Sequence, residues 1–151
     1  MEISLNADVI FASPNATFRL PDPLRGTVAL LGVLPRAFMQ FGNHRTMDLI
    51  LSARSLSADE AVSWGLVKEV VPLDQLVDKA VAYAELIASM SPDSVIISRR
   101  EARAAYDAQV RGTAMKAVDL WEGWLSRSPN FREGLAAFKA KRKPNWVNSS
   151  L

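Results

Sequence analysis

Residues 56–67 read LSADEAVSWGLV and stand where the chain becomes strongly helical. Ser57 followed three residues later by Glu60 is a capping-box pattern, in which the two side chains bond each other's backbone N–H groups at a helix start. Gly65 has the conformational freedom that the residue after a helix end needs. The stretch therefore predicts a short helix that stops at Gly65, followed by a β-rich run over residues 66–71.

Helix signals dominate the sequence after this stretch. Residues 74–90 place apolar side chains at the spacing of an amphipathic helix. The Ser-Pro pairs at 91–92 and 128–129 each put a capping Ser before a Pro at the first helical position, which starts two further helices. Another helix is predicted between them, over residues 113–125.

Two short extended segments precede the helices. Residues 8–13 (DVIFAS) read as a buried strand, and residues 16–20 form a second piece that ends at the turn 21–23 (PDP). Pro23 disfavours the α conformation at Asp22, which predicts a rigid, non-helical turn. A lone pair of strands is marginal in water, so the first strand is expected to need partner strands. A mostly helical protein with a small hairpin is the alternative interpretation.

The composition excludes several kinds of active site. The chain has 49% hydrophobic and 23% charged residues, which is typical of a soluble globular domain. It has no cysteine, which excludes disulfides, thiolate metal sites and a cysteine nucleophile. His44 is the only histidine, so a histidine metal cluster is excluded and a Ser-His-Asp triad is disfavoured. Acid–base chemistry therefore falls mainly to carboxylates, and no metal site is predicted.

The basic excess of the chain is local. The formal net charge is +2, and basic side chains gather near the C-terminus at Lys139, Lys141, Arg142 and Lys143. Such a short cluster suits a phosphate-bearing small ligand, and it lacks the aromatic platform or motif of a nucleic-acid-binding protein. No apolar run reaches the ~18 residues of a membrane span, and the N-terminus has no basic signal-peptide segment. Neither nucleic acid nor a membrane is therefore expected as a partner.

The order of these features resembles the crotonase superfamily, the enoyl-CoA hydratase/isomerase enzymes. Residues 56–67 are similar to the family block Ile-Ser-Ala-x-Glu-Ala…Gly-Leu-Val, and residues 18–22 (FRLPD) to its Phe-x-x-Pro-Glu turn. The other matching positions are Glu2 and Asp8 before the strand VIFAS, the spaced Gly26, Gly32, Arg36 and Gly42, and the C-terminal Glu133-Gly134, Phe138 and Lys141-Arg142. The resemblance implies an α/β protein, the C-terminal part of a crotonase-like spiral fold, with short strands first and then mainly helices. It assigns residues 1–72 to the end of the core and residues 73–151 to a helical region for oligomerisation and CoA contact.

The resemblance also implies a reaction. Hydration of an α,β-unsaturated thioester needs water at Cβ and a proton at Cα on the same face, which two carboxyls about one water apart can deliver as base and acid. These roles fall to Glu2 and Asp22. Phe138 and Lys141 are implied to contact the adenine and the phosphates of coenzyme A. No permanently bound cofactor is implied, because the acyl-CoA substrate carries the coenzyme.

Each of these residues also has a purely structural interpretation. Glu2 suits a solvated position near a helix start, and Asp22 suits a turn flanked by prolines. Phe138 and Lys141 fit an apolar helix face followed by a solvated basic tail. For the function, two alternatives to a hydratase stay open: an isomerase of the same superfamily that uses only the carboxyl at Asp22, and a non-catalytic assembly module.

The chain departs from the family pattern in three respects. Asp22 is one methylene shorter than the usual Glu, and Ala29 and Val33 replace a frequent Pro and a frequent Gly. The sequence begins at Met1, directly before Glu2, whereas in the family a Gly-Gly-Gly run and a sheet-rich half precede this Glu and supply the oxyanion hole. We therefore expect a truncated chain that is poorly active alone and whose acyl specificity the sequence does not define.

Assembly and location follow from the same resemblance. A homotrimer or hexamer is expected through the helices of residues 91–142, where Trp121 and Trp124 lie on one helix face and suit a buried interface. A soluble intracellular protein is expected, in the mitochondrial matrix or the cytoplasm. The C-terminal Ser149-Ser150-Leu151 is a degenerate form of a peroxisomal address, which makes the peroxisome a third option.

Overall fold

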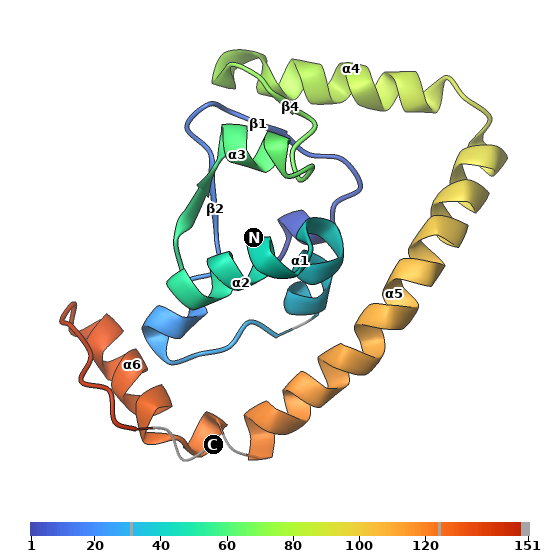
Figure 1. The fold of residues 1–151 in the computed structure, drawn as a ribbon. Coiled ribbons are helices and arrows are strands. Elements are labelled where there is room, and N and C mark those ends of the chain that lie inside the picture. The colour runs from blue at the N-terminus through green and yellow to red at the C-terminus, as the bar shows by residue number, and fades with distance from the viewer. Residues whose placement is uncertain (31, 124, 149–151) are drawn as a thin grey trace.

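A computed structural model describes residues 1–30, 32–123 and 125–148 (Figure 1). In chain order its elements are the 3-10 helix η1 (Ser4–Asn6), strands β1 (Phe11–Ala12) and β2 (Thr17–Arg19), the 3-10 helix η2 (Asp22–Arg25), helices α1 (Val33–Phe41) and α2 (Asn43–Ser52), strand β3 (Ser55–Ser57), helix α3 (Ala58–Ser63), strand β4 (Glu69–Val70), the 3-10 helix η3 (Leu73–Gln75), helices α4 (Leu76–Ala88) and α5 (Pro92–Gly123), the 3-10 helix η4 (Leu125–Arg127) and helix α6 (Pro129–Lys139). Two short strands therefore come first, β3 and β4 alternate with helices α2 and α3, and only helices follow within the described residues.

The strands form two small sheets, each built from segments that are far apart in sequence. β1 pairs in parallel with β4. β2 pairs antiparallel with β3, which places Phe18 opposite Leu56, and both side chains are buried. The strand predicted over residues 8–13 is present, but β1 covers only two of them, because β4 offers a partner only there.

The hydrophobic core lies between these strands and helices α1 to α3. Val33, Leu49 and Leu56 are the largest of its fully buried side chains. Val33 and Phe41 lie about two turns apart on one face of α1, so a single apolar stripe of that helix enters the core. Trp64 follows α3 and packs its ring against Phe41, with 5.5 Å between the ring centroids. Trp64 is therefore part of the packing around α1.

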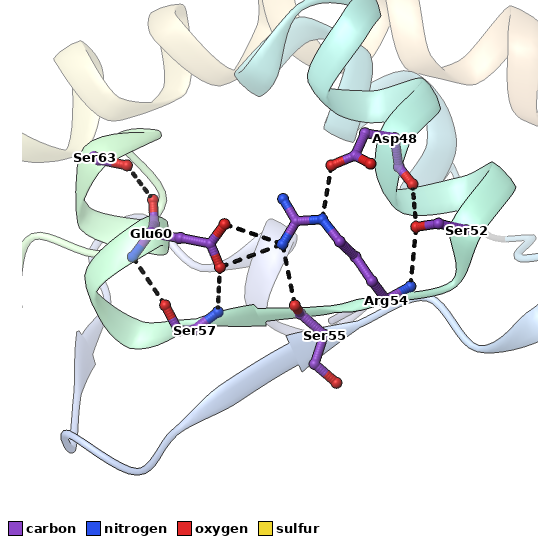
Figure 2. Close-up of polar contacts among 7 residues, drawn as sticks. All are labelled: Asp48, Ser52, Arg54, Ser55, Ser57, Glu60 and Ser63. Atoms are coloured by element: carbon purple, nitrogen blue, oxygen red, sulfur yellow. Dashed lines mark hydrogen bonds and ion pairs between the residues drawn. The ribbon is translucent and has the colours of Figure 1, made fainter.

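The predicted capping box is present at the start of α3 (Figure 2). Ser57 Oγ accepts a hydrogen bond from the Glu60 backbone N–H at 3.2 Å, and Glu60 Oε2 accepts one from the Ser57 N–H at 3.1 Å. Arg54 extends the box toward α2, because its guanidinium donates to Glu60 Oε1 at 3.0 Å and to Asp48 Oδ2 at 2.7 Å. The Ser57 N–H and then Arg54 lower the pKa of Glu60, so this carboxylate stays charged at neutral pH.

Ser57→Ala is expected to lower the free energy of unfolding by about 1 kcal/mol, the typical effect of losing a helix N-cap. The change removes the acceptor of the Glu60 N–H and leaves the backbone unchanged. Urea denaturation followed by circular dichroism measures the difference. Ser55→Ala is the matched control, because Ser55 is an exposed serine on the adjoining strand β3. An equal loss of stability in both variants would contradict the capping role.

Helices α4 and α5 form an open arm that runs around the outside of the core (Figure 1). α5 is one continuous helix from Pro92 to Gly123, so the separate helix predicted over residues 113–125 is wrong. The reason is that no proline follows Pro92 within this stretch, and Gly112 weakens a helix interior by only about 1 kcal/mol. The boundary predicted after residue 72 falls just before this arm and stays a prediction.

Ion pairs connect α5 to the rest of the fold at two positions along the helix. Arg36 of α1 donates to Asp107 at 3.1 Å. Farther toward the start of α5, Asp8 binds Arg99 and Arg103, each at 2.9 Å. Burial raises the pKa of Asp8, but the hydrogen bonds from the two arginines lower it more, so the pKa of this carboxyl ends below its ordinary value.

The arm exposes many apolar side chains. No residue of α4 is buried. Val77 and Leu86 on α4 and Ile97 and Leu120 on α5 are each more than half exposed. Within the described ranges no single helix is long and apolar enough to cross a membrane, and one bent pair, residues 73–88 with 92–127, meets the criteria of length and composition together.

Candidate functional site

Asp22 opens η2, the short 3-10 helix that follows β2. The non-helical turn predicted here is therefore wrong, because Pro23 is tolerated at the first positions of a helical turn, where no N–H donor is needed. Thr27 holds the aspartate from the far end of η2. Its N–H donates to the Asp22 C=O at 3.0 Å, and its hydroxyl donates to Asp22 Oδ1 at 3.2 Å. These bonds fix the direction of a partly buried carboxylate.

Glu2 lines the same cleft as Asp22, although the two residues are distant in sequence. The cleft has a volume of about 510 Å³ and also includes Arg19 and Arg25. The Glu2 side chain is exposed, and its backbone C=O accepts a hydrogen bond from the Asn6 side chain at 2.9 Å, which orders the chain at this point. The structure thus brings the two predicted acids to one cleft and adds two guanidinium groups. The catalytic roles of the acids stay a prediction.

Phe138 lies beside this cleft, whereas Lys141 faces a neighbouring groove. The Arg25 guanidinium stacks over the Phe138 ring at 4.3 Å from its centroid, which is a cation–π distance. Phe138 is still 59% exposed, so part of its ring is open to a ligand. Lys141 lines a groove together with Pro23 and Leu24 of η2. Lys141 therefore lines a groove that shares η2 with the cleft, and Phe138 is connected to the cleft through its contact with Arg25.

Two glycines let α6 approach η2 backbone to backbone. A Cβ added at Gly134 would collide with the Arg25 carbonyl and lie 2.8 Å from the Gly26 nitrogen. A Cβ added at Gly26 would lie 2.5 Å from the Asn130 carbonyl oxygen, and the φ of Gly26, 65°, is itself in the left-handed region that favours glycine. The position of Asp22 therefore depends on how the C-terminal helix docks.

The segment after α6 folds back along that helix. Arg142 forms a bidentate pair with Glu133, at 2.6 and 2.9 Å, and the Asn145 N–H donates to Glu133 Oε1 at 2.6 Å. Asn130 and Val147 exchange two hydrogen bonds, at 2.8 and 2.9 Å. The Arg142 guanidinium and then the Asn145 N–H lower the pKa of Glu133 to about 2. The basic tail is thus held against α6 by a charged contact.

This tail is expected to be released only as the pH falls toward about 2. The ordinary pKa of Glu133 is 4.5 and its folded-state pKa is about 2, so the contact is fully present above pH 4.5 and is lost progressively below it. The amide NMR signal of Asn145 measures the release during an acid titration.

Two variants serve as comparisons for this acid titration. Glu133→Ala should give the signal of the released tail at neutral pH. Glu122→Ala, at an exposed position on α5, should leave the signal of Asn145 unchanged. A wild-type midpoint near 4.5, the ordinary value for this carboxyl, would contradict the paired state.

Sequence reasoning missed the side chains that support the acids. Arg25 and Thr27 stand at positions of no quoted motif, and Thr27 reaches Asp22 only because η2 turns the chain back on itself. The only available signal was closeness in sequence, since both residues lie within five positions of the end of the FRLPD stretch. Gly134 was noted as part of a motif, but its contact with η2 is long-range and has no local signature.

Several other predicted residues have simple outcomes. His44 is exposed near the start of α2. Within the described part of the chain there is no group of three or more side chains that could hold a metal ion. The predicted interface pair, Trp121 and Trp124, and the predicted address at residues 149–151 lie outside the residues or side chains that the structure describes.

Comparisons with known proteins identify the family of the chain. The family model described as enoyl-CoA hydratase/isomerase matches residues 1–149. A mevalonyl-coenzyme A hydratase of Aspergillus fumigatus is 41% identical over 151 residues, which is 99% of this chain and 56% of the relative. A probable mitochondrial enoyl-CoA hydratase of Dictyostelium discoideum is 31% identical over 147 residues, which is 97% of this chain and 53% of the relative.

A solved structure extends the likeness to the fold. The crystal structure of an enoyl-CoA hydratase/isomerase from Pseudoalteromonas atlantica matches with a TM-score of 0.88 at 33% identity, covering 97% of this chain and 58% of that one. The predicted α/β fold is therefore confirmed. This chain spans about half the length of the curated relatives that it matches.

Proposed function

This chain belongs to the enoyl-CoA hydratase/isomerase family, and we propose that the protein hydrates a 2-enoyl-CoA thioester, adding water to one face of the double bond. The observation that carries the proposal is the cleft that Glu2 and Asp22 share. Both relatives described above are named as hydratases, which supports the same reaction class. The coenzyme A of the substrate is the only cofactor that the proposal needs.

The two carboxyls suit a reaction that moves two protons. One carboxylate takes a proton from water as the water oxygen bonds to Cβ, and the other carboxyl, protonated, donates its proton to Cα. The Thr27 hydroxyl keeps Asp22 Oδ1 in a fixed direction, so the proton moves along a defined path. Negative charge builds on the thioester oxygen during this step, and positive groups aimed at it lower the barrier. Arg25 supplies positive charge within the cleft.

Coenzyme A is proposed to lie along η2 and the end of α6. Phe138 offers an exposed aromatic ring on which adenine can stack. Arg25 stacks on the same ring and also lines the cleft that contains Glu2 and Asp22. Lys141 lines the adjoining groove and provides a positive charge for a phosphate. Arg142 is already bound to Glu133, so its role is to hold the tail in place.

The proposed function is tested by assaying residues 1–151 with crotonyl-CoA, alone and joined to the part of the A. fumigatus relative that lies outside the match. Loss of the conjugated double bond with formation of a 3-hydroxyacyl-CoA is the result expected of the joined form. A product whose double bond has moved without gaining water would identify an isomerase instead. An enzymatic role would be contradicted if neither residues 1–151 alone nor the joined chain, each shown to be folded, reacted with a series of enoyl-CoA thioesters.

A homotrimer or a hexamer is proposed, with α4 and α5 at the contacts between copies. The support is the apolar surface of the arm, which includes Val77, Ile97 and Leu120, because monomers rarely expose so many apolar side chains on one element. Analytical ultracentrifugation at micromolar concentration should show a species of three or six chains. The double variant Val77→Lys and Ile97→Lys should shift it to the monomer, and a monomeric wild type would contradict the proposal.

The mitochondrial matrix is the proposed location, because the D. discoideum relative is named as mitochondrial. The alternative is a peroxisomal address at residues 149–151. A fluorescent fusion that leaves the C-terminus free distinguishes the two. Co-localisation with a peroxisomal marker that is lost on removal of these residues would contradict the proposed location.

A further inference from the structure

An apolar cavity adjoins the cleft at Asp22. Its volume is about 170 Å³, and its walls include Val28, Ala29, Leu34 and Ile50. Asp22 lines both this cavity and the cleft that contains Glu2, so the two hollows meet at the proposed reacting group. An enclosed apolar cavity of about 150 Å³ binds benzene, so this partly open cavity of similar volume has room for a group of about six carbons.

A second, larger apolar groove lies behind this cavity. Its volume is about 450 Å³, and it is lined by residues of α1, α2 and α5, among them Phe38, Met39 and Met47. Leu34 of α1 and Ile50 of α2 line both the cavity and the groove. Both side chains are partly buried and pack against the core. They therefore form the wall that separates the two apolar spaces.

We propose that Leu34 and Ile50 set the maximum length of the acyl group. The inference rests on the proposed function, because it places the reacting carbons of the acyl chain at Asp22. A chain with up to about six carbons beyond Cβ fills the cavity, and a longer chain meets the wall. In an apolar pocket, one additional methylene changes discrimination by about 10-fold or more. The position of Ala29, where the family frequently has Pro, belongs to the same cavity.

The kinetic test compares the kcat/KM values for 2-tetradecenoyl-CoA and 2-hexenoyl-CoA. In the double variant Leu34→Ala and Ile50→Ala the cavity and the groove become continuous, so the ratio of the long to the short substrate should rise by about 10-fold or more. Ala29→Val narrows the cavity and should lower the rate with 2-hexenoyl-CoA relative to crotonyl-CoA. Met47→Ala changes the groove alone and is the matched control. A purely structural effect would lower all substrates together and leave each ratio unchanged.

A binding test needs no catalysis. Benzene added to residues 1–151 should shift the methyl NMR signals of Leu34 and Ile50, and 1-phenyldecane should bind with comparable affinity only in the double variant. Absence of any benzene shift at these methyls would overturn the inference. Hydration of enoyl-CoA thioesters with a chain-length profile that the double variant does not change would also overturn it, and would leave the proposed function intact. Benzene binding without hydration of any enoyl-CoA would overturn the proposed function and, with it, the acyl assignment.

Discussion

Asp22→Asn is expected to lower kcat for the hydration of crotonyl-CoA by about 10²–10⁴-fold, the usual contribution of a general acid or base. Asparagine keeps the size of the side chain and an oxygen that can accept the Thr27 hydrogen bond, so the fold of η2 should persist. Only the capacity to exchange a proton is lost. The effect is measured by steady-state kinetics with crotonyl-CoA, on residues 1–151 alone or joined to the unmatched part of the A. fumigatus relative, whichever shows turnover.

The controls separate chemistry from folding. Asp59→Asn changes an exposed aspartate in the first turn of α3 and should leave kcat unchanged. Asp22→Glu restores the residue usual in the family and should retain activity. Glu2→Gln should reduce hydration as strongly as Asp22→Asn. Full activity in Glu2→Gln together with its loss in Asp22→Asn would point to the single-acid isomerase, and activity within about 3-fold of wild type in both would contradict acid–base roles for these carboxyls.

Gly134→Ala is expected to destabilise the protein by about 1–3 kcal/mol, because the new methyl group meets the backbone of Arg25, which cannot rotate away as a side chain does. Helix α6 should move off η2, and the Asp22 turn should move with it. Since a displacement of about 1 Å at a catalytic group can lower the rate about 100-fold, activity should fall as well. Urea denaturation and crotonyl-CoA kinetics measure the two effects.

Gly112→Ala is the matched control for this prediction. Gly112 lies in the interior of α5, and a Cβ added there meets nothing within 4 Å. Alanine should therefore stabilise the helix by about 0.5–1 kcal/mol, with no change in activity. Wild-type stability and activity in Gly134→Ala would show that α6 does not position the Asp22 turn.

The sequence correctly predicted the helix starts that are determined by contacts between residues close together in the chain. The capping box of Ser57 and Glu60 and the cap at Ser128 bond to backbone groups within three residues, so the sequence contains all that is needed to find them. The Asp22 turn was predicted at the right place, but its 3-10 conformation was missed because Pro23 is compatible with the first positions of a helical turn. The predicted break before residue 113 was wrong because helix propensity alone does not end a helix without a breaking residue.

The rest of the fold and of the site depends on contacts between distant segments. The pairing of β1 with β4 joins residues on either side of helices α1 to α3, and the pairing of β2 with β3 joins residues on either side of α1 and α2. No local pattern specifies either pairing. The family motifs indicated Glu2 and Asp22 as partners, which the shared cleft supports. The cation–π contact of Arg25 with Phe138 depends on how α6 docks, so it could be found only in the folded chain.

The paired-acid mechanism is tested most directly by the product that residues 1–151, alone and joined to the unmatched part of the A. fumigatus relative, form from crotonyl-CoA in D₂O. Paired carboxyls in one cleft predict 3-hydroxybutyryl-CoA that carries one deuterium at Cα, on the same face as the hydroxyl at Cβ. The Glu2→Gln and Asp22→Asn variants should each form this product about 10²–10⁴-fold more slowly. NMR of the purified product gives this stereochemistry. Deuterium on the opposite face, or a shifted double bond without a hydroxyl group, would contradict hydration by the paired carboxyls.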